Sequence, residues 1–156
     1  MASVDRSYIR VKAMLIAPND DSTAHAVSLN PPTEENPDGF HRLVGGSVEL
    51  GETHRDAIER EVQEELGAEI REIRFLATVE NIFRIHGVLG HEIVFLYVGR
   101  LDPAPVETGA TLTEADGSVA AVVSRPVDDA DEPLPLYPSG VAEWVRRLFD
   151  SPGARS

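Results

Sequence analysis

The chain has 156 residues, which suits one domain with a single hydrophobic core, and 42% of them are hydrophobic. It contains no cysteine, which excludes a disulfide framework, a thiolate nucleophile and a cysteine-ligated zinc site. The formal net charge of −13 disfavours nucleic acid as a partner, whereas a small phosphorylated substrate that arrives with Mg²⁺ avoids the repulsion.

The chain shows no internal repeat, linker or composition change that would mark a second domain. We therefore expect residues 1–150 to form one domain and residues 151–156 to be a disordered tail. No apolar run approaches the length of a membrane span, and the first residues lack the apolar core of a signal peptide. These features predict a cytoplasmic protein with no membrane partner.

The amino-terminal part predicts β-strands separated by loops. Residues Tyr8 to Ala17 are rich in β-forming side chains, and Ala24 to Leu29 continue this pattern. The paired prolines and the Pro-Asp-Gly sequence between Asn30 and Gly39 predict an irregular loop. Phe40 to Val44 return to the strand pattern and lead into two adjacent glycines.

A helix is predicted between Thr53 and Gly67. Thr53 is a favourable N-cap, and Asp56, three residues later, suits the positive end of the helix. Gly67 stands where a left-handed C-cap would end the helix, because a residue without Cβ adopts positive φ at little cost.

Three carboxylates of this helix fall on one narrow face. At 100° per residue, Glu61, Glu64 and Glu65 lie within about a third of a turn, beside an apolar stripe. Such carboxylates repel one another unless a cation neutralises them, and Mg²⁺ prefers oxygen ligands of this kind. The alternative interpretation is an ordinary solvated helix face.

The segment after the helix predicts a hairpin and a proline-rich loop. Ile70 to Phe83 and His91 to Leu101 are expected as strands joined by a turn over Arg84 to Gly90. His86 and His91 flank this turn, and we interpret both as solvent-exposed rather than as ligands.

The rest of the chain predicts a loop, a strand and a closing helix. Leu101 to Gly117 is expected to be a loop and Ser118 to Val123 a strand. Ser139 is expected to cap a terminal helix in which Trp144 docks on the sheet. The hydrophobic strand from Ile93 to Val98, expected at a sheet edge, is compatible with a homodimer.

Seven residues around the acidic helix have a spacing that chance does not explain. Multiplying this chain's own residue frequencies gives a scrambled chain a probability of roughly 10⁻⁵ of matching it. The positions are Gly46, Glu52, Arg60, Glu61, Glu64, Glu65 and Gly67.

This spacing resembles the signature of the Nudix hydrolases. Every fixed position matches, and the departures are Ala68, where a larger aliphatic residue is usual, and Val44, where many members have proline. The resemblance spans roughly Tyr8 to Leu148 and implies the Nudix fold, an α/β/α sandwich with a mixed β-sheet between helices. The sequence pattern alone supports only an α+β class.

The resemblance also implies a metal site that holds Mg²⁺, with Mn²⁺ as a substitute. It assigns metal binding to the carbonyl of Gly46 and to the carboxylates of Glu61, Glu64 and Glu65. Glu52 is expected to brace this site rather than bind the ion.

The resemblance leaves the general base open between Glu61 and Glu64. Arg60 is expected to orient Glu61 by a charge-assisted hydrogen bond, or else to be an ordinary surface arginine. Some members take a further ligand or base from a later loop, and the candidates here are Glu107, Glu114 and Asp116.

These features predict Mg²⁺-dependent hydrolysis of a pyrophosphate bond in a nucleoside diphosphate linked to another group. Oxidised nucleoside triphosphates, ADP-ribose, nucleotide sugars and dinucleoside polyphosphates are all open as substrates. The alternative is a Nudix-fold nucleotide-binding or regulatory module without hydrolysis. A Nudix-fold isomerase acting on an isoprenyl diphosphate is disfavoured, because the resemblance implies a catalytic cysteine for that activity.

Overall fold

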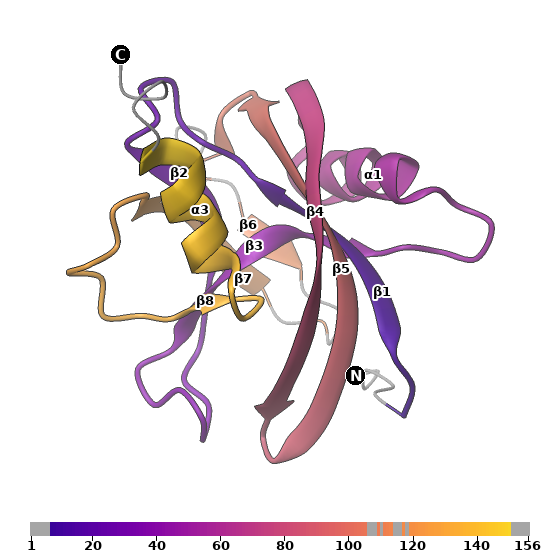
Figure 1. Ribbon diagram of the computed structural model, residues 1–156, viewed down its shortest axis with the longest axis vertical. Coiled ribbons are helices and arrows are strands. Elements are labelled where there is room, and N and C mark those ends of the chain that lie inside the picture. Colours follow the sequence, from indigo (N-terminus) through magenta and orange to yellow (C-terminus); the bar gives the residue numbers. More distant parts are fainter. Residues whose placement is uncertain (1–6, 106–108, 110, 114–116, 118, 151–156) are drawn as a thin grey trace.

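The computed structural model describes residues 7–105, 109, 111–113, 117 and 119–150 (Figure 1). The elements in chain order are β1 (Arg10–Ile16), β2 (Ala24–Asn30), β3 (Phe40–Ser47), α1 (His54–Leu66), β4 (Glu69–Ile85), β5 (Val88–Asp102), β6 (Thr111–Thr113), β7 (Val119–Pro126), β8 (Leu136–Tyr137) and α3 (Val141–Asp150).

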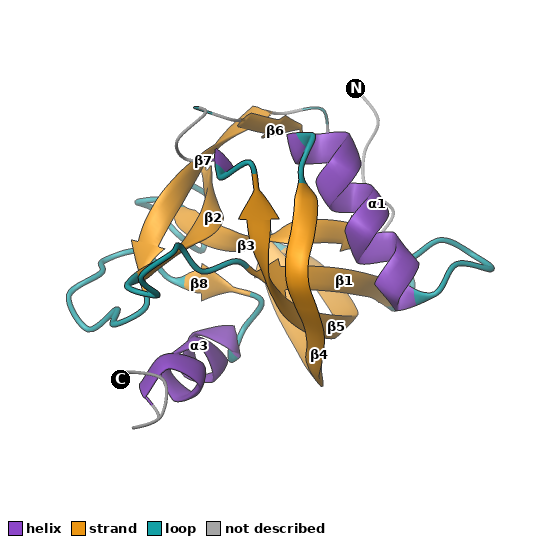
Figure 2. Ribbon diagram, turned by 90° about the horizontal axis from the view of Figure 1, so that it is seen from above, coloured by secondary structure: helices purple, strands orange, loops and turns teal. Residues whose placement is uncertain are grey.

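The strands form a mixed sheet with the order β4-β5-β1-β3-β2-β7-β6, and β8 pairs with β3 outside this path. Strand β1 is parallel to β5 and β3 is parallel to β8, whereas the other neighbours are antiparallel. Helices α1 and α3 lie on opposite sides of the strands (Figure 2). The predicted arrangement of a mixed sheet between helices is therefore confirmed.

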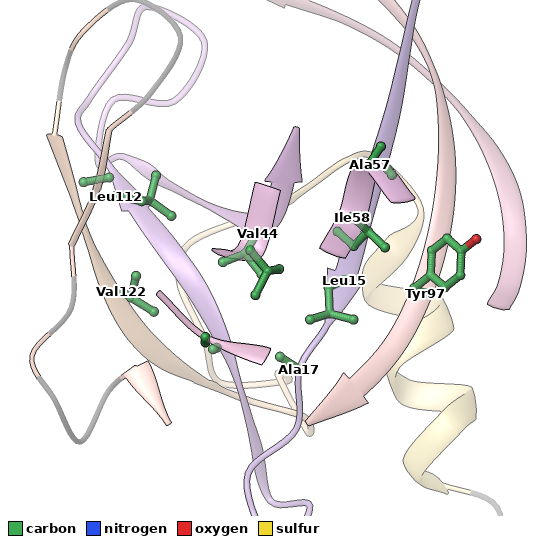
Figure 3. Close-up of a cluster of buried hydrophobic side chains, with 13 residues drawn as sticks. Leu15, Ala17, Val44, Ala57, Ile58, Tyr97, Leu112 and Val122 are labelled. Atoms are coloured by element: carbon green, nitrogen blue, oxygen red, sulfur yellow. The ribbon is translucent and has the colours of Figure 1, made fainter. Parts of the chain in front are cut away.

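The side chains of β1 alternate between two cores, which explains the layered arrangement. Ala13 and Leu15 join the cluster beneath α1, where Ile58 and Val62 are buried (Figure 3). Met14 and Ile16 point to the other face and join a second cluster, which contains Val141 and Val145 of α3. Because successive strand side chains point to opposite faces, this one strand supports both helices.

Helix α3 docks as the sequence predicts, although it begins later. Trp144 is partly buried and packs against the second cluster, so its predicted docking role is confirmed. The helix begins at Val141, two residues after the predicted cap at Ser139.

The long hairpin of β4 and β5 differs in detail from the prediction. The turn is narrower than predicted, because β4 continues to Ile85 and β5 begins at Val88. Strand β4 contains register shifts between Arg71 and Arg74 and between Phe75 and Ala77. Strand β5 lies between β4 and β1, so placing Ile93 to Val98 at an edge is wrong, and so is the argument for a dimer built on it.

Two short strands interrupt segments that the sequence marks as loops. Strand β6 lies inside the proline- and glycine-containing segment after β5, and β8 lies among the prolines before α3. Both are only two or three residues long and exist because they pair with β7 and β3. In the described part of the chain, every helix is too short or too polar to span a bilayer.

Candidate active site

Helix α1 is fixed at both ends by the predicted caps. The Thr53 hydroxyl accepts the backbone N–H of Asp56 at 3.1 Å, and Gly67 adopts the left-handed conformation with φ 61°. The buried face of α1 carries Ala57, Ile58 and Val62. The caps and this apolar stripe set the rotation of the helix, so its glutamates point away from the core.

The two glycines that end β3 allow α1 to approach the sheet closely. A Cβ atom on Gly46 would lie 2.3 Å from the carboxyl carbon of Glu61. A Cβ atom on Gly45, whose φ is 145°, would lie 2.2 Å from the carbonyl oxygen of Ala13. Gly46 therefore leaves room for the Glu61 carboxylate against the backbone of β3, whereas Gly45 allows β3 to pair with β1.

The guanidinium of Arg60 joins the helix to the loop that precedes it. It donates two hydrogen bonds to Glu52, at 2.7 and 2.9 Å, and a third to the carbonyl of Ser47 at 3.0 Å. It also donates to Glu61 at 3.0 Å and to Glu64 at 3.1 Å. The expected contact between Arg60 and Glu61 is present, and only 24% of the arginine side chain is exposed.

Glu52 is held in its charged form by these contacts. Hydrogen bonds from Arg60 and from the backbone N–H of Glu49 lower the pKa of Glu52 to about 2. The same pairing raises the pKa of Arg60 further above its already high value. The pair is therefore charged throughout the physiological pH range.

Glu61, Glu64 and Glu65 line one wall of a cavity of about 380 Å³. The Glu61 side chain is 15% exposed and the Glu64 side chain is 61% exposed. Gly45 and Gly46 of β3 and Thr111 and Thr113 of β6 also line this cavity. The structure thus gathers four of the predicted metal-binding residues, Gly46 and the three glutamates, around one space.

The cavity lining also contains two cations that the sequence analysis missed. Lys12 of β1 and Arg42 of β3 both line the cavity, and Lys12 is buried. Burial, with a contribution from the nearby Arg42, lowers the pKa of Lys12 to about 8. The available signal was the single lysine of the chain standing inside an apolar strand.

Arg42 forms an ion pair with Glu92, a buried residue that is itself hydrogen-bonded. Its guanidinium lies 3.7 Å from Glu92, whose other carboxylate oxygen accepts a hydrogen bond from Asn81 at 3.2 Å. The side-chain oxygen of Asn81 accepts the backbone N–H of Ser139, just before α3, at 3.0 Å. Glu92 and Asn81 therefore connect the cavity wall to the carboxyl-terminal part of the chain.

The remaining predicted positions lie elsewhere or outside the described residues. His86 is exposed at the hairpin turn, and its backbone N–H donates to Glu35. His91 contacts Glu80 at 3.0 Å. Neither histidine is among the described residues that line the cavity. The side chain of His91 is only 28% exposed, so the expectation of a solvent-exposed residue is wrong for His91. Glu107, Glu114 and Asp116 lie outside the residues that the structure describes.

The acidic wall has the chemistry that a hard divalent cation requires. Among the described residues, no three acidic or histidine side chains surround one point. Arg60 holds one oxygen each of Glu61 and Glu64, and the other oxygen of each carboxylate is of the kind that a hard cation prefers. With Glu65 and the backbone of Gly46 lining the same cavity, the donor set has the chemistry that suits a divalent ion.

Comparison with known proteins identifies the family. A family model of the NUDIX domain matches residues 11–148. The chain belongs to the Nudix family. This membership supports a hydrolase, and Nudix hydrolases generally use a divalent metal ion. No curated protein sequence matches the chain significantly.

Solved structures of other Nudix proteins share the fold. The MutT Nudix hydrolase from Burkholderia pseudomallei is 19% identical, with a TM-score of 0.62 over 90% of this chain and 98% of that one. A structure described as an ADP compounds hydrolase is 17% identical, with a TM-score of 0.60 over 94% and 76%. A protein from Jonesia denitrificans, described as a possible asymmetric diadenosine tetraphosphate hydrolase, is 16% identical, with a TM-score of 0.58 over 95% and 96%.

Proposed function

We propose that this Nudix protein hydrolyses a pyrophosphate bond in a nucleoside diphosphate linked to another group. The observation that carries the proposal is the acidic wall of α1, organised by Arg60 and facing a cavity beside Gly46. The named structural relatives include hydrolases of nucleotide compounds, which supports the substrate class.

In this proposal Mg²⁺ is held by the carbonyl of Gly46 and by Glu61, Glu64 and Glu65, and Mn²⁺ can replace it. When bound, the ion supplies charge neutralisation for the phosphate oxygens and makes a bound water more acidic. Arg60 orients Glu61 by a charge-assisted hydrogen bond, and Glu52 in turn fixes Arg60 through two hydrogen bonds.

We assign acceptance of the water proton to Glu64. Its side chain is 61% exposed and therefore within reach of a water molecule, whereas the Glu61 side chain is 15% exposed and lies against β3. A base must lie within hydrogen-bonding distance of the proton that it removes, and the more exposed carboxylate meets that condition more easily.

The proposal is tested with a substrate panel and one charge-removing variant. Oxidised nucleoside triphosphates, ADP-ribose, nucleotide sugars and dinucleoside polyphosphates are each incubated with Mg²⁺, and release of a nucleoside monophosphate or inorganic phosphate is measured. We expect one class to be hydrolysed, chelation to stop turnover, and Glu61→Gln to reduce kcat by roughly 100-fold or more.

Two outcomes would count against this function. Binding of a nucleotide without hydrolysis of any class would instead support a regulatory module of the same fold. Near-normal turnover by Glu61→Gln would remove Glu61 from the mechanism, since this change keeps the shape of the side chain and removes only its charge.

A further inference from the structure

Lys12 occupies an unusual place for a charged side chain. It is the only lysine of the chain, its exposed fraction is 5%, and it lines the same cavity as the glutamates of α1. Burying an ammonium group is costly unless anionic oxygens compensate its charge. A purely structural role would therefore require a carboxylate partner nearby.

The nearest candidate partner is already engaged by other groups. One carboxylate oxygen of Glu92 accepts a hydrogen bond from Asn81, and the other lies 3.7 Å from Arg42. Glu92 and, to a smaller extent, Glu61 contribute to the electrostatic environment of Lys12. Across the described residues, however, no side chain forms a hydrogen bond or close ion pair with Lys12. The ammonium group is thus available to an anion that enters the cavity.

Arg42 adds a second cation beside Lys12. Its guanidinium also lines the cavity, and 28% of its side chain is exposed. Arginine and lysine are the usual donors to phosphate oxygens, and a bidentate arginine adds geometric selectivity. Lys12 and Arg42 thus make part of the cavity lining positive, although the protein as a whole has a net charge of −13.

We propose that Lys12 and Arg42 form a phosphate-binding subsite in the cavity that the glutamates of α1 also line, where they hold a phosphoryl group of the substrate. This inference rests on the proposed function, because the glutamates repel an anion unless a divalent cation is bound to them. One phosphoryl group would then be held through the metal and another by the two cations. Such a site selects diphosphates and longer chains over phosphate monoesters.

The proposal is tested by measuring two affinities in the same protein. The first is that of Mn²⁺, followed by electron paramagnetic resonance, and the second is that of methylenediphosphonate for the Mn²⁺-loaded protein, followed by calorimetry. We expect Lys12→Met and Arg42→Gln each to weaken methylenediphosphonate binding by 10-fold or more. Affinity for Mn²⁺ should be unchanged or higher, because removing a nearby cation relieves repulsion of the metal.

A loss of affinity for methylenediphosphonate without a loss of affinity for Mn²⁺ distinguishes a binding role from a structural one. A variant that merely disturbs the fold would lose both affinities, and Arg42→Gln, at a partly exposed position, provides a second test if Lys12→Met folds poorly. Arg147→Met on α3 is the matched control, since it removes an equal charge from a residue that pairs with Glu143. It should change neither affinity.

The failure of this inference is distinguishable from failure of the proposed function. If the wild-type protein binds Mn²⁺ and both variants bind methylenediphosphonate as tightly as it does, the subsite is refuted and the hydrolase proposal stands. If the wild-type protein binds no Mn²⁺, the metal site is refuted and the subsite with it.

Discussion

Arg60 links four separate groups of the site through one planar side chain. Its five N–H donors serve Glu52, Ser47, Glu61 and Glu64, an arrangement that a lysine ammonium cannot reproduce. The loop before α1 and the acidic face of α1 are therefore held in register by a single residue.

Replacing Arg60 by lysine should lower kcat/KM by roughly 10- to 100-fold, because hydrogen bonds to charged groups are worth about 1.5 to 3 kcal/mol. Steady-state kinetics with the substrate found in the panel measures the effect. Arg55→Lys is the control, since Arg55 lies on the same helix and, in the described part of the chain, forms its ion pair with the exposed Glu59. An equal loss in both variants would contradict the positioning role of Arg60.

His25 is a buried histidine outside the cavity, and burial lowers its pKa from 6.5 to about 4. Between these values the unfolded chain binds more protons than the folded one, so the free energy of unfolding rises with pH. The stabilisation is complete above pH 6.5 and is lost as the pH falls towards 4. The whole effect is roughly 3 kcal/mol.

Urea unfolding of the wild-type protein and of His25→Phe at several pH values isolates this contribution. The aromatic replacement keeps a ring in the same space but cannot titrate, so the difference between the two proteins should follow the window from pH 6.5 to 4. The groups that influence His25 most, Arg125, His41 and Asp129, are present in both proteins. If the free energies of unfolding of the two proteins changed in parallel with pH, His25 would not be the source of the pH dependence.

At the scale of elements, the turn between β3 and α1 depends on two glycines in different ways. Gly45→Ala should destabilise the fold by roughly 2 kcal/mol or more, because the new Cβ meets the backbone of Ala13 and φ is positive. Gly46→Ala meets only the movable end of Glu61, so it should fold well but lose roughly 100-fold in activity. Urea unfolding measures the stability of each variant and steady-state kinetics its activity, so together they distinguish the roles of Gly45 and Gly46.

The reverse pattern would show that these glycines are misassigned. If Gly46→Ala unfolded readily and Gly45→Ala were stable and inactive, the close approach of Glu61 to β3 would not be what requires Gly46.

The sequence predicts elements well where the controlling interactions are local. The caps of α1 involve residues at most four positions apart, and both are found where the pattern places them. Strand β8 escapes prediction because its two residues are ordered by pairing with β3, far away in the chain. Strand β6 escapes prediction because its three residues are too few to show a strand pattern.

In the site, too, residues within one helix could be predicted from the sequence, whereas residues on separate strands could not. The glutamates of α1 follow from helical periodicity, and the structure brings them to one cavity. Lys12 and Arg42 could not be placed in the same cavity from the sequence, because their position depends on how β1, β3 and β5 pair. The interior position of β5 is likewise set by its parallel pairing with β1, which no local pattern encodes.

At the scale of the whole molecule, the excess of negative charge should make the proposed metal a stabilising ligand. Ligand binding to the folded state alone raises the free energy of unfolding by about 2.7 kcal/mol at about 100 times the Kd. We expect Mg²⁺ to stabilise the wild-type protein but not a variant with Glu61→Gln and Glu65→Gln. Thermal unfolding at several Mg²⁺ concentrations measures this.

General screening of the −13 charge must be separated from specific binding. Sodium chloride at matched ionic strength serves this purpose and should stabilise both proteins to the same small extent. Equal stabilisation of both proteins by Mg²⁺ and by the sodium salt would leave no specific ion site on α1.

Two hydrogen bonds, from Ser139 to Asn81 and from Asn81 to Glu92, and the ion pair between Glu92 and Arg42 connect the start of α3 to the cavity. We therefore expect a truncation that removes α3, or a ligand that displaces it, to shift Arg42 as well. Ser139 and Arg42 stand 97 positions apart in the sequence, so a change at the last helix would alter the cavity through contacts that the sequence order does not reveal.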